Sequence, residues 1–236
     1  MGDRHSHQII MDTSPAAAAS PIISDEAARL LTGLEATGMF ACVLLYIWQW
    51  QEVVPHLWIL LLAFVFASHF VHRDTLQNLG LTLFELRPSA ERVLPIVLAL
   101  YVPLVVYGFA AGRLRLIAPS FAVLAYFVGY GSWCAAQQYL LQSYFHNRLL
   151  RALRNPHLSS VLAAVMFGAA HIPNPVLMVA TTVAGFIFAE VFAHYRNIWP
   201  LAFAQTVGGF LVAAISPPWL IHNMRVGPGY LLWNLR

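Results

Sequence analysis

Apolar residues occupy long stretches of the chain, and polar residues gather in the short segments between them. Seven apolar stretches stand out, at residues 34–50, 57–72, 94–111, 117–145, 158–172, 176–194 and 198–216. They are bounded by Arg, Pro, Asn or Gly, and they approach or exceed the roughly 20 residues that a helix needs to cross a hydrocarbon core about 30 Å thick. The pattern predicts an all-α fold, a polytopic transmembrane bundle of about seven to eight helices.

Two segments depart from the pattern of simple spans. The fourth stretch runs without a helix breaker from Ser120 past Gln142 to Arg151, which predicts one long helix that projects beyond the bilayer. Residues 73–92 mix apolar triplets such as Leu79-Gly80-Leu81 with charged side chains. We expect that segment to be amphipathic and to lie on the membrane surface.

The two ends of the chain lie outside the apolar stretches. Residues 1–32 lack the continuous apolar core of a signal peptide, and we expect a flexible N-terminal tail there. The bundle then occupies residues 33–216. Residues 217–236 carry Trp219, Tyr230 and Trp233, which suits either an interfacial C-terminal tail or a partial eighth crossing.

Composition excludes a water-soluble domain. Hydrophobic residues make up 59% of the chain and charged residues 10%, against about 25% charged in a typical soluble domain. The net charge of +3 is too small to indicate nucleic-acid binding. Cys42 and Cys134 both fall in apolar stretches, so no disulfide framework or thiolate cluster follows.

The arginines are distributed unequally between alternate loops. Taking the spans in order places the larger set on one side of the membrane, and this set comprises Arg4, Arg29, Arg73, Arg87, Arg92, Arg148, Arg151, Arg154 and Arg196. The smaller set comprises Arg113, Arg115, Arg225 and Arg236. The positive-inside rule predicts that the larger set is cytoplasmic, and we expect a multi-pass protein of a bacterial inner membrane.

Few polar side chains lie at membrane depth, and nearly all of them fall in the second half of the chain. Glu190 is the only carboxylate after Glu91. The other polar residues of these apolar stretches are Gln137, Gln138, Gln142, His171, His194 and Gln205. Because such groups are costly in lipid, we expect them to face the interior of the bundle.

The order and spacing of these residues resemble a known family, the CAAX-processing and bacteriocin-processing (CPBP) intramembrane proteases. Its members carry a Glu-Glu-x-x-x-Arg motif, then Phe-x-x-x-His, then His-x-x-x-Asn or Asp. Here residues 137–142 stand at the first motif, Phe167 to His171 at the second and Gln205 to Gly209 at the third. Gln137 and His171 are 34 residues apart, as are His171 and Gln205. The similarity covers about residues 85–215 and implies helices around a central polar cavity, expected near the cytoplasmic side.

The chemistry of the motifs differs from that of the family. The resemblance implies that glutamates and histidines activate water, but here Gln137, Gln138 and Gln142 replace Glu, Glu and Arg. Gln205 replaces His, and Gly209 replaces Asn or Asp. An amide has no useful basicity near neutral pH, so it cannot take a proton from water as a glutamate can. His171 is the one member of the working set that is retained, which predicts a catalytically degenerate site.

Other polar residues allow further interpretations. Glu190 and His194 are four residues apart and share a helix face, so they suit either a solvated helix end or a replacement acid–base role together with His171. His69 and His72 precede Arg73, and we expect them at the membrane interface. A haem- or pigment-bearing subunit would need histidines at matched depth, and this is a third class of function.

The leading hypothesis is therefore a membrane-embedded pseudoenzyme of the CPBP type that binds or organises a peptide, lipid or protein partner. Residues 137, 138, 142, 167, 171, 205 and 209 would line its cavity. The alternative is an active intramembrane endopeptidase that processes prenylated or leader peptides, with His171 and Glu190 as catalytic residues. We expect no cofactor in the leading case, and zinc only in the alternative, because a catalytic zinc needs about three protein ligands.

Overall fold

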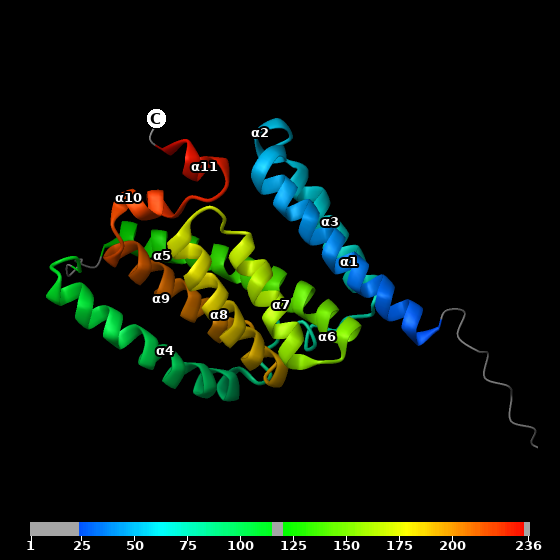
Figure 1. Ribbon diagram of the computed structural model, residues 1–236. Helices are drawn as coiled ribbons and strands as arrows, with labels where there is room; N and C mark the ends of the chain where they lie inside the picture. The colour runs from blue at the N-terminus through cyan, green and yellow to red at the C-terminus, as the bar shows by residue number, and fades with distance from the viewer. Residues whose placement is uncertain (1–23, 115–119, 234–236) are drawn as a thin grey trace, which may run out of the picture.

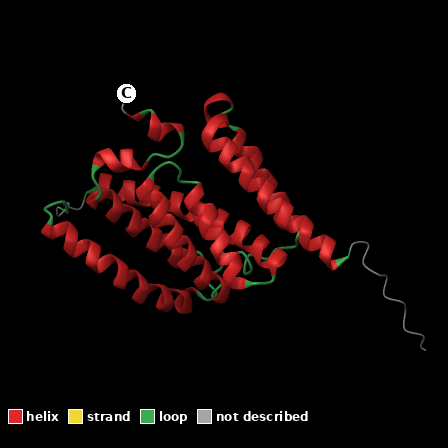
Figure 2. Cartoon of the chain, viewed as in Figure 1, coloured by secondary structure: helices red, strands yellow, loops and turns green. Residues whose placement is uncertain are grey.

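The computed structural model describes residues 24–114 and 120–233, and within these ranges the chain forms helices and loops without a strand (Figure 2). The main helices are α1 (Asp25–Leu45), α3 (Leu57–Val71), α4 (Leu86–Ala110), α5 (Phe121–Gln138), α6 (Asn147–Leu153), α7 (Pro156–Ala169), α8 (Pro175–His194) and α9 (Trp199–Ile215). The short ones are η1 (Tyr46–Trp50), α2 (Gln51–Val53), η2 (Tyr139–His146), α10 (Pro218–Ile221), η3 (His222–Met224) and α11 (Pro228–Leu231). The prediction of an all-α bundle is confirmed.

Three helical rods are long and apolar enough to cross a membrane. They are Asp25–Val53, which joins α1, η1 and α2, together with α4 and α8. Helices α3, α7 and α9 are shorter and also apolar. Large hydrophobic side chains lie on the outside of the bundle, for example Leu98, Val102 and Val106 on α4. A continuous surface of this kind suits lipid rather than water.

The helices form two groups (Figure 1). The α1–α2 rod and α3 form a hairpin that contacts α6, and Gln51 and Glu52 at its α2 end line a cavity together with α5 and the C-terminal segment. In the second group, α7 packs along α8, and α9 lies against both α4 and α5. The polar side chains of the fourth, fifth and seventh predicted spans thereby face one interior.

The predicted long helix runs from Phe121 to Leu153 through α5, η2 and α6 without interruption. Ser120 caps its start by accepting a hydrogen bond from the Val123 amide at 3.3 Å. Residues 139–146 are wound as a π-helix, a form that is rare and often occurs at functional sites. This π-helical segment begins directly after Gln138.

The predicted boundaries at the chain ends need correction. The tail was expected to extend to residue 32, but Ser24 caps α1 by accepting from the Ala27 amide at 3.1 Å, and Asp25 and Glu26 occupy the first turn. Residues 25–32 are therefore helical, and the rest of the predicted tail, residues 1–23, lies outside the described residues. At the other end, residues 217–233 form only short helices, none long enough to cross a bilayer.

Residues 73–92 were expected to be an amphipathic segment on the membrane surface, and their place relative to the membrane stays a prediction. Residues 72–85 form turns that fold under the end of the bundle, and α4 begins at Leu86. Gly80 has a φ of 71°, and a Cβ there would lie 2.6 Å from the Phe192 ring and 3.2 Å from backbone atoms of Arg196 and Asn197. Its carbonyl accepts from the Ile198 amide at 3.1 Å. Backbone pairing with Ile198 thus fixes these turns at the end of the bundle.

A buried ionic cluster joins the α1–α3 hairpin to α6. We call it the Arg148 cluster, and it comprises Glu35, Ser68, His69, His72, Asp74, Tyr144, Arg148 and Arg151. The Arg148 guanidinium is fully buried and lies 2.9 Å from Asp74 and 3.2 Å from Glu35. His69 is buried and its Nδ1 lies 2.8 Å from Asp74, and its expected position at the membrane interface stays a prediction. His72 Nε2 contacts Glu35 at 2.8 Å.

The described arginines divide between the two ends of the bundle as the loop count predicted. Arg29 donates to the Ala152 carbonyl, Arg154 pairs with Asp25, and Arg196 bonds Asn147, so these arginines and the Arg148 cluster share one end. We call this the arginine-rich end. Arg113 bonds the Ile215 carbonyl at the opposite end.

Candidate functional site

Four glutamine side chains meet between α5, η2 and α9. Gln205 accepts from Gln138 Nε2 at 2.6 Å and donates to Gln137 Oε1 at 2.6 Å, so it bridges the two neighbours. Gln142 Nε2 donates to Gln138 Oε1 at 3.2 Å. Gln138 and Gln142 are fully buried, and among the described residues Gln142 Oε1 finds no partner. The positions of the family's charged motif residues thus hold a neutral, hydrogen-bonded amide network.

His171 lies in the turn between α7 and α8, and a backbone contact fixes its tautomer. Its Nδ1 lies 2.7 Å from the Phe167 carbonyl oxygen, which can only accept, so Nδ1 carries the hydrogen of the neutral ring. The lone pair of that ring is then on Nε2. The Phe167 ring meets the imidazole edge to face at 5.0 Å. The Phe-x-x-x-His spacing therefore places Phe167 against His171, and the Phe167 carbonyl and ring orient the imidazole.

The turn that carries His171 is fastened to the C-terminal segment. Buried Asn174 caps α8 and also donates to the carbonyls of Ile221 and Arg225, at 2.8 and 3.1 Å. The Gly227 amide donates to the Ile172 carbonyl at 2.8 Å. Residues 221–227 consequently form a wall beside His171.

Two adjoining cavities meet at His171, and we name them by their linings. The apolar chamber has a volume of about 410 Å³ and is formed mainly by α4, α5, α8 and α9. The polar chamber has a volume of about 380 Å³ and lies between α2, α5, the His171 turn and the C-terminal segment. Four residues line both, namely Trp133, Gln137, His171 and Met224. Gln205, Phe167 and Gly209 line only the apolar chamber.

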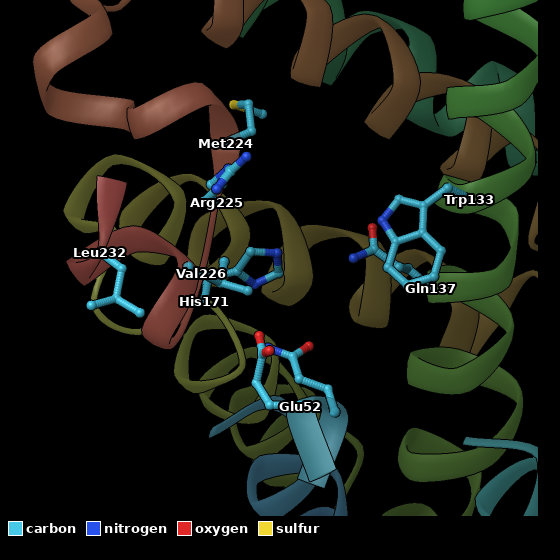
Figure 3. A pocket seen from close by; sticks show the side chains of 10 residues that line it. Glu52, Trp133, Gln137, His171, Met224, Arg225, Val226 and Leu232 are labelled. Atoms are coloured by element: carbon cyan, nitrogen blue, oxygen red, sulfur yellow. The ribbon is translucent and has the colours of Figure 1, made fainter. Parts of the chain in front are cut away.

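The two chambers differ in charge. The described walls of the apolar chamber contain no Asp, Glu, Arg or Lys. The polar chamber has one acid and one base, Glu52 from α2 and Arg225 from the C-terminal segment. Figure 3 shows these two side chains on opposite sides of the His171 ring, with Gln137 and Trp133 across the cavity on α5.

Two glycines of α9 are held by tyrosines of neighbouring helices. A Cβ on Gly209 would overlap the Tyr130 hydroxyl, and one on Gly208 would overlap the Tyr101 hydroxyl. Tyr101 also donates to the Ala204 carbonyl at 3.0 Å. The Tyr130 phenol of α5 therefore occupies the space that the family's Asn or Asp side chain would need at position 209. Gly209 allows this close packing.

Glu190 lies far from the other predicted site residues. It stands fifteen residues into α8, roughly 20 Å along the axis from the end beside His171, and it lines neither chamber. Its carboxylate contacts His157 at 2.9 Å, and His194 Nδ1 lies 2.9 Å from its backbone oxygen. The structure therefore does not bring His171 and Glu190 together as a pair.

The cavity lies toward one end of the bundle. His171 stands two residues beyond the end of α7, at the end of the bundle opposite the arginine-rich end, and the expected position of the cavity near the cytoplasmic side stays a prediction. The amide network lies deeper, where α5 passes into η2. The direction of α7 explains the position of His171. The helix begins beside Arg154 at the arginine-rich end, and the motif histidine follows its opposite end.

The donors around His171 do not fit a catalytic zinc ion. Among the described residues no group of three His, Cys, Asp or Glu side chains could hold a metal. Beside His171 stand the amides of Gln137 and Gln205, which are weak ligands compared with the imidazoles and carboxylates of zinc sites.

The family comparison agrees with the motif spacing. Residues 119–211 match the family model described as Type II CAAX prenyl endopeptidase Rce1-like. This segment is Rce1-like. The Rce1-like segment holds all three motif positions, from Gln137 to Gly209, and the resemblance inferred from the sequence is confirmed. No curated protein and no solved structure matches the chain.

Two charged residues of the site lie outside the Rce1-like segment and were not expected there. Glu52 precedes it in the chain and Arg225 follows it. The sequence offers only a weak signal for Glu52, a polar run of Gln49, Gln51 and Glu52 at the end of an apolar helix. No spacing rule places that run in one cavity with a histidine more than a hundred residues later, so their shared cavity depends on helix packing.

Proposed function

We propose that this chain is a membrane-embedded Rce1-like protein without peptidase chemistry, and that it binds the apolar chain of a lipid or lipidated peptide in the apolar chamber. One observation carries the proposal. The chamber lies where the family's water-activating residues would stand, yet its described walls are mostly aliphatic and aromatic. Their polar groups are imidazole, amides and hydroxyls, and none is a carboxylate. Hydrolysis there would lack a carboxylate base, whereas an apolar chain would find matching walls.

Access from the bilayer supports a lipid ligand. Leu100 on α4 and Val183 on α8 both line the chamber, and their exposed fractions are 42% and 48%. A chain could therefore enter from the hydrocarbon without crossing water, and transfer from lipid to the chamber would cost little. The amide network of Gln137, Gln138 and Gln205 would close the deep end of the chamber.

We place the protein in a bacterial inner membrane as a multi-pass bundle, with the arginine-rich end in the cytoplasm. The positive-inside rule supports this orientation, because the arginines of the Arg148 cluster, Arg29, Arg154 and Arg196 share that end. His171 and the polar chamber would then lie near the outer leaflet.

Photo-labelling tests this function. A photoactivatable fatty acyl or prenyl probe should label α4 and α8 of the purified protein in mild detergent. Ala180→Trp, which fills the apolar chamber from α8, should lower labelling several-fold. Ala99→Trp on the exposed side of α4 is the matched control and should label like the wild type. Equal labelling of both variants would contradict the proposal.

An active endopeptidase is the second candidate, and one observation favours it: the Glu52 carboxylate lines the same chamber as His171. Incubation with a prenylated peptide distinguishes the two functions. We expect no cleavage and less than stoichiometric zinc by elemental analysis. Cleavage that is abolished by His171→Ala, or about one zinc per chain lost in that variant, would establish the endopeptidase instead.

A further inference from the structure

The polar chamber adjoins the apolar chamber and carries the charged side chains. Glu52 is exposed and Arg225 is half-buried, and both line the chamber. Within residues 24–114 and 120–233 neither side chain forms an ion pair with an opposite charge. Figure 3 places them apart, with the His171 ring between them. One negative and one positive group are thus available to a ligand.

The positive group is held in place. The Arg225 guanidinium lies over the Trp233 ring, 5.0 Å from its centre, and the Arg225 carbonyl accepts from buried Asn174. A stacked guanidinium keeps its charge and presents a fork of N–H donors that matches a phosphate. On the opposite wall, the Glu52 carboxylate can accept hydrogen bonds, and Gln51 beside it adds an amide oxygen.

The tryptophans around the polar chamber are typical of the depth of lipid headgroups. Several tryptophans gather at this end of the chain's helices, and they are Trp48, Trp50, Trp58, Trp219 and Trp233. Trp48, Trp58 and Trp219 are exposed. Tryptophan is enriched where the hydrocarbon meets the headgroups, so a ligand whose chain fills the apolar chamber would bring its headgroup to Glu52 and Arg225.

We propose that the two chambers together form a site for a zwitterionic phospholipid with a primary ammonium group, of the phosphatidylethanolamine type. The phosphate binds Arg225, the ammonium donates to Glu52 and Gln51, and an acyl chain occupies the apolar chamber. A trimethylammonium headgroup has no N–H to donate, and an anionic glycerol headgroup would face Glu52 without a positive charge. The inference rests on the proposed function and adds the ligand's headgroup chemistry.

Binding to lipids of matched acyl chains tests this site. The purified protein would be titrated, by native mass spectrometry or by quenching of tryptophan with brominated chains, with phosphatidylethanolamine, phosphatidylcholine and phosphatidylglycerol. We expect the first to bind several-fold more tightly than the others. Glu52→Gln should remove that preference, and Arg225→Gln should weaken binding of all three. Neither residue belongs to a motif of the Rce1-like segment.

Two controls and the remaining outcomes separate this inference from the proposed function. Glu91→Gln and Arg113→Gln change the same charges away from both chambers and should bind like the wild type. One outcome is that Ala180→Trp abolishes lipid binding, while the headgroup and the Glu52 and Arg225 variants have no effect on affinity. That outcome would overturn the headgroup site and leave the proposed function standing. Binding that Ala180→Trp leaves unchanged would overturn both. Displacement of bound lipid by a prenylated peptide, with no headgroup preference, would assign the site to a peptide.

Discussion

The Tyr130 hydroxyl occupies the space that a side chain at position 209 would need. Gly209→Asn, which restores the residue type of the family motif, should therefore destabilise the bundle by about 1–3 kcal/mol through overpacking. Thermal unfolding in detergent measures the change. Gly129→Ala on α5 is the matched control, because a Cβ there meets nothing within 4 Å. A stable Gly209→Asn protein would show that Tyr130 moves easily and that the motif position is open.

The amide network makes a second prediction at the level of single residues. Gln137→Glu, Gln138→Glu, Gln142→Arg and Gln205→His together restore the family's charged set. Gln138 and Gln142 are fully buried and hydrogen-bonded as amides, so buried charge with imperfect partners should cost several kcal/mol.

We expect the fourfold variant to express poorly or to unfold at a lower temperature than the wild type. The single change Gln205→Leu is a useful comparison, since it removes two interhelical hydrogen bonds without adding charge and should cost about 1–2 kcal/mol. If the fourfold variant is stable, binds zinc and cleaves peptides, the cavity has kept its catalytic shape.

Between elements, the Arg148 cluster holds the α1–α3 hairpin on α6. Arg148→Leu would remove the buried guanidinium that pairs with both Glu35 and Asp74, and the fully buried Asp74 side chain would keep only Arg151 and His69 as partners. Breaking a buried pair in this way costs about 3–5 kcal/mol. Arg87→Leu is the control, because the Arg87–Glu91 pair is exposed and should contribute little. Similar melting temperatures for the two variants would contradict this role of the cluster.

The same cluster predicts how stability depends on pH. Burial alone would raise the pKa of Asp74, but hydrogen bonds from His69 and Arg148 and the charges of Arg148 and Arg151 hold that pKa below its ordinary value. A carboxyl with a depressed folded-state pKa stabilises the fold above its unfolded pKa of about 3.9, and this contribution is lost as the pH falls through the lower folded value. The free energy of unfolding, measured from pH 6 downward, should decrease with pH, and the decrease should be smaller in the Asp74→Asn variant.

At the scale of the whole molecule, the two ends of the bundle should face opposite sides of the membrane. Single cysteines introduced as Arg87→Cys and Arg113→Cys, after replacement of Cys42 and Cys134, report the orientation. A membrane-impermeant thiol reagent should label position 113 in intact cells and position 87 only after lysis, because the arginine-rich end is retained in the cytoplasm. The reverse labelling would invert the proposed orientation and place the polar chamber at the inner leaflet.

The sequence by itself determined the helical rods and the chemistry at the motif positions. Apolar runs of sufficient length specify helices through local hydrophobicity, and the substitution of Glu, Arg and His by Gln is legible in the residues. The spacing of Gln137, His171 and Gln205 also predicted the resemblance of residues 119–211 to the Rce1-like family model, because each motif is local in the chain.

Tertiary structure alone decided which polar groups meet. The helices are apolar on most sides, so their pattern does not show which face is inside, and it could not predict that His69 is buried or that residues 72–85 fold under the bundle. Glu52 and Arg225 line one cavity with His171 because α2 and the C-terminal segment both lie beside the α7–α8 turn. Residues so distant in the chain come together through the packing of whole helices, and local sequence patterns do not predict this packing.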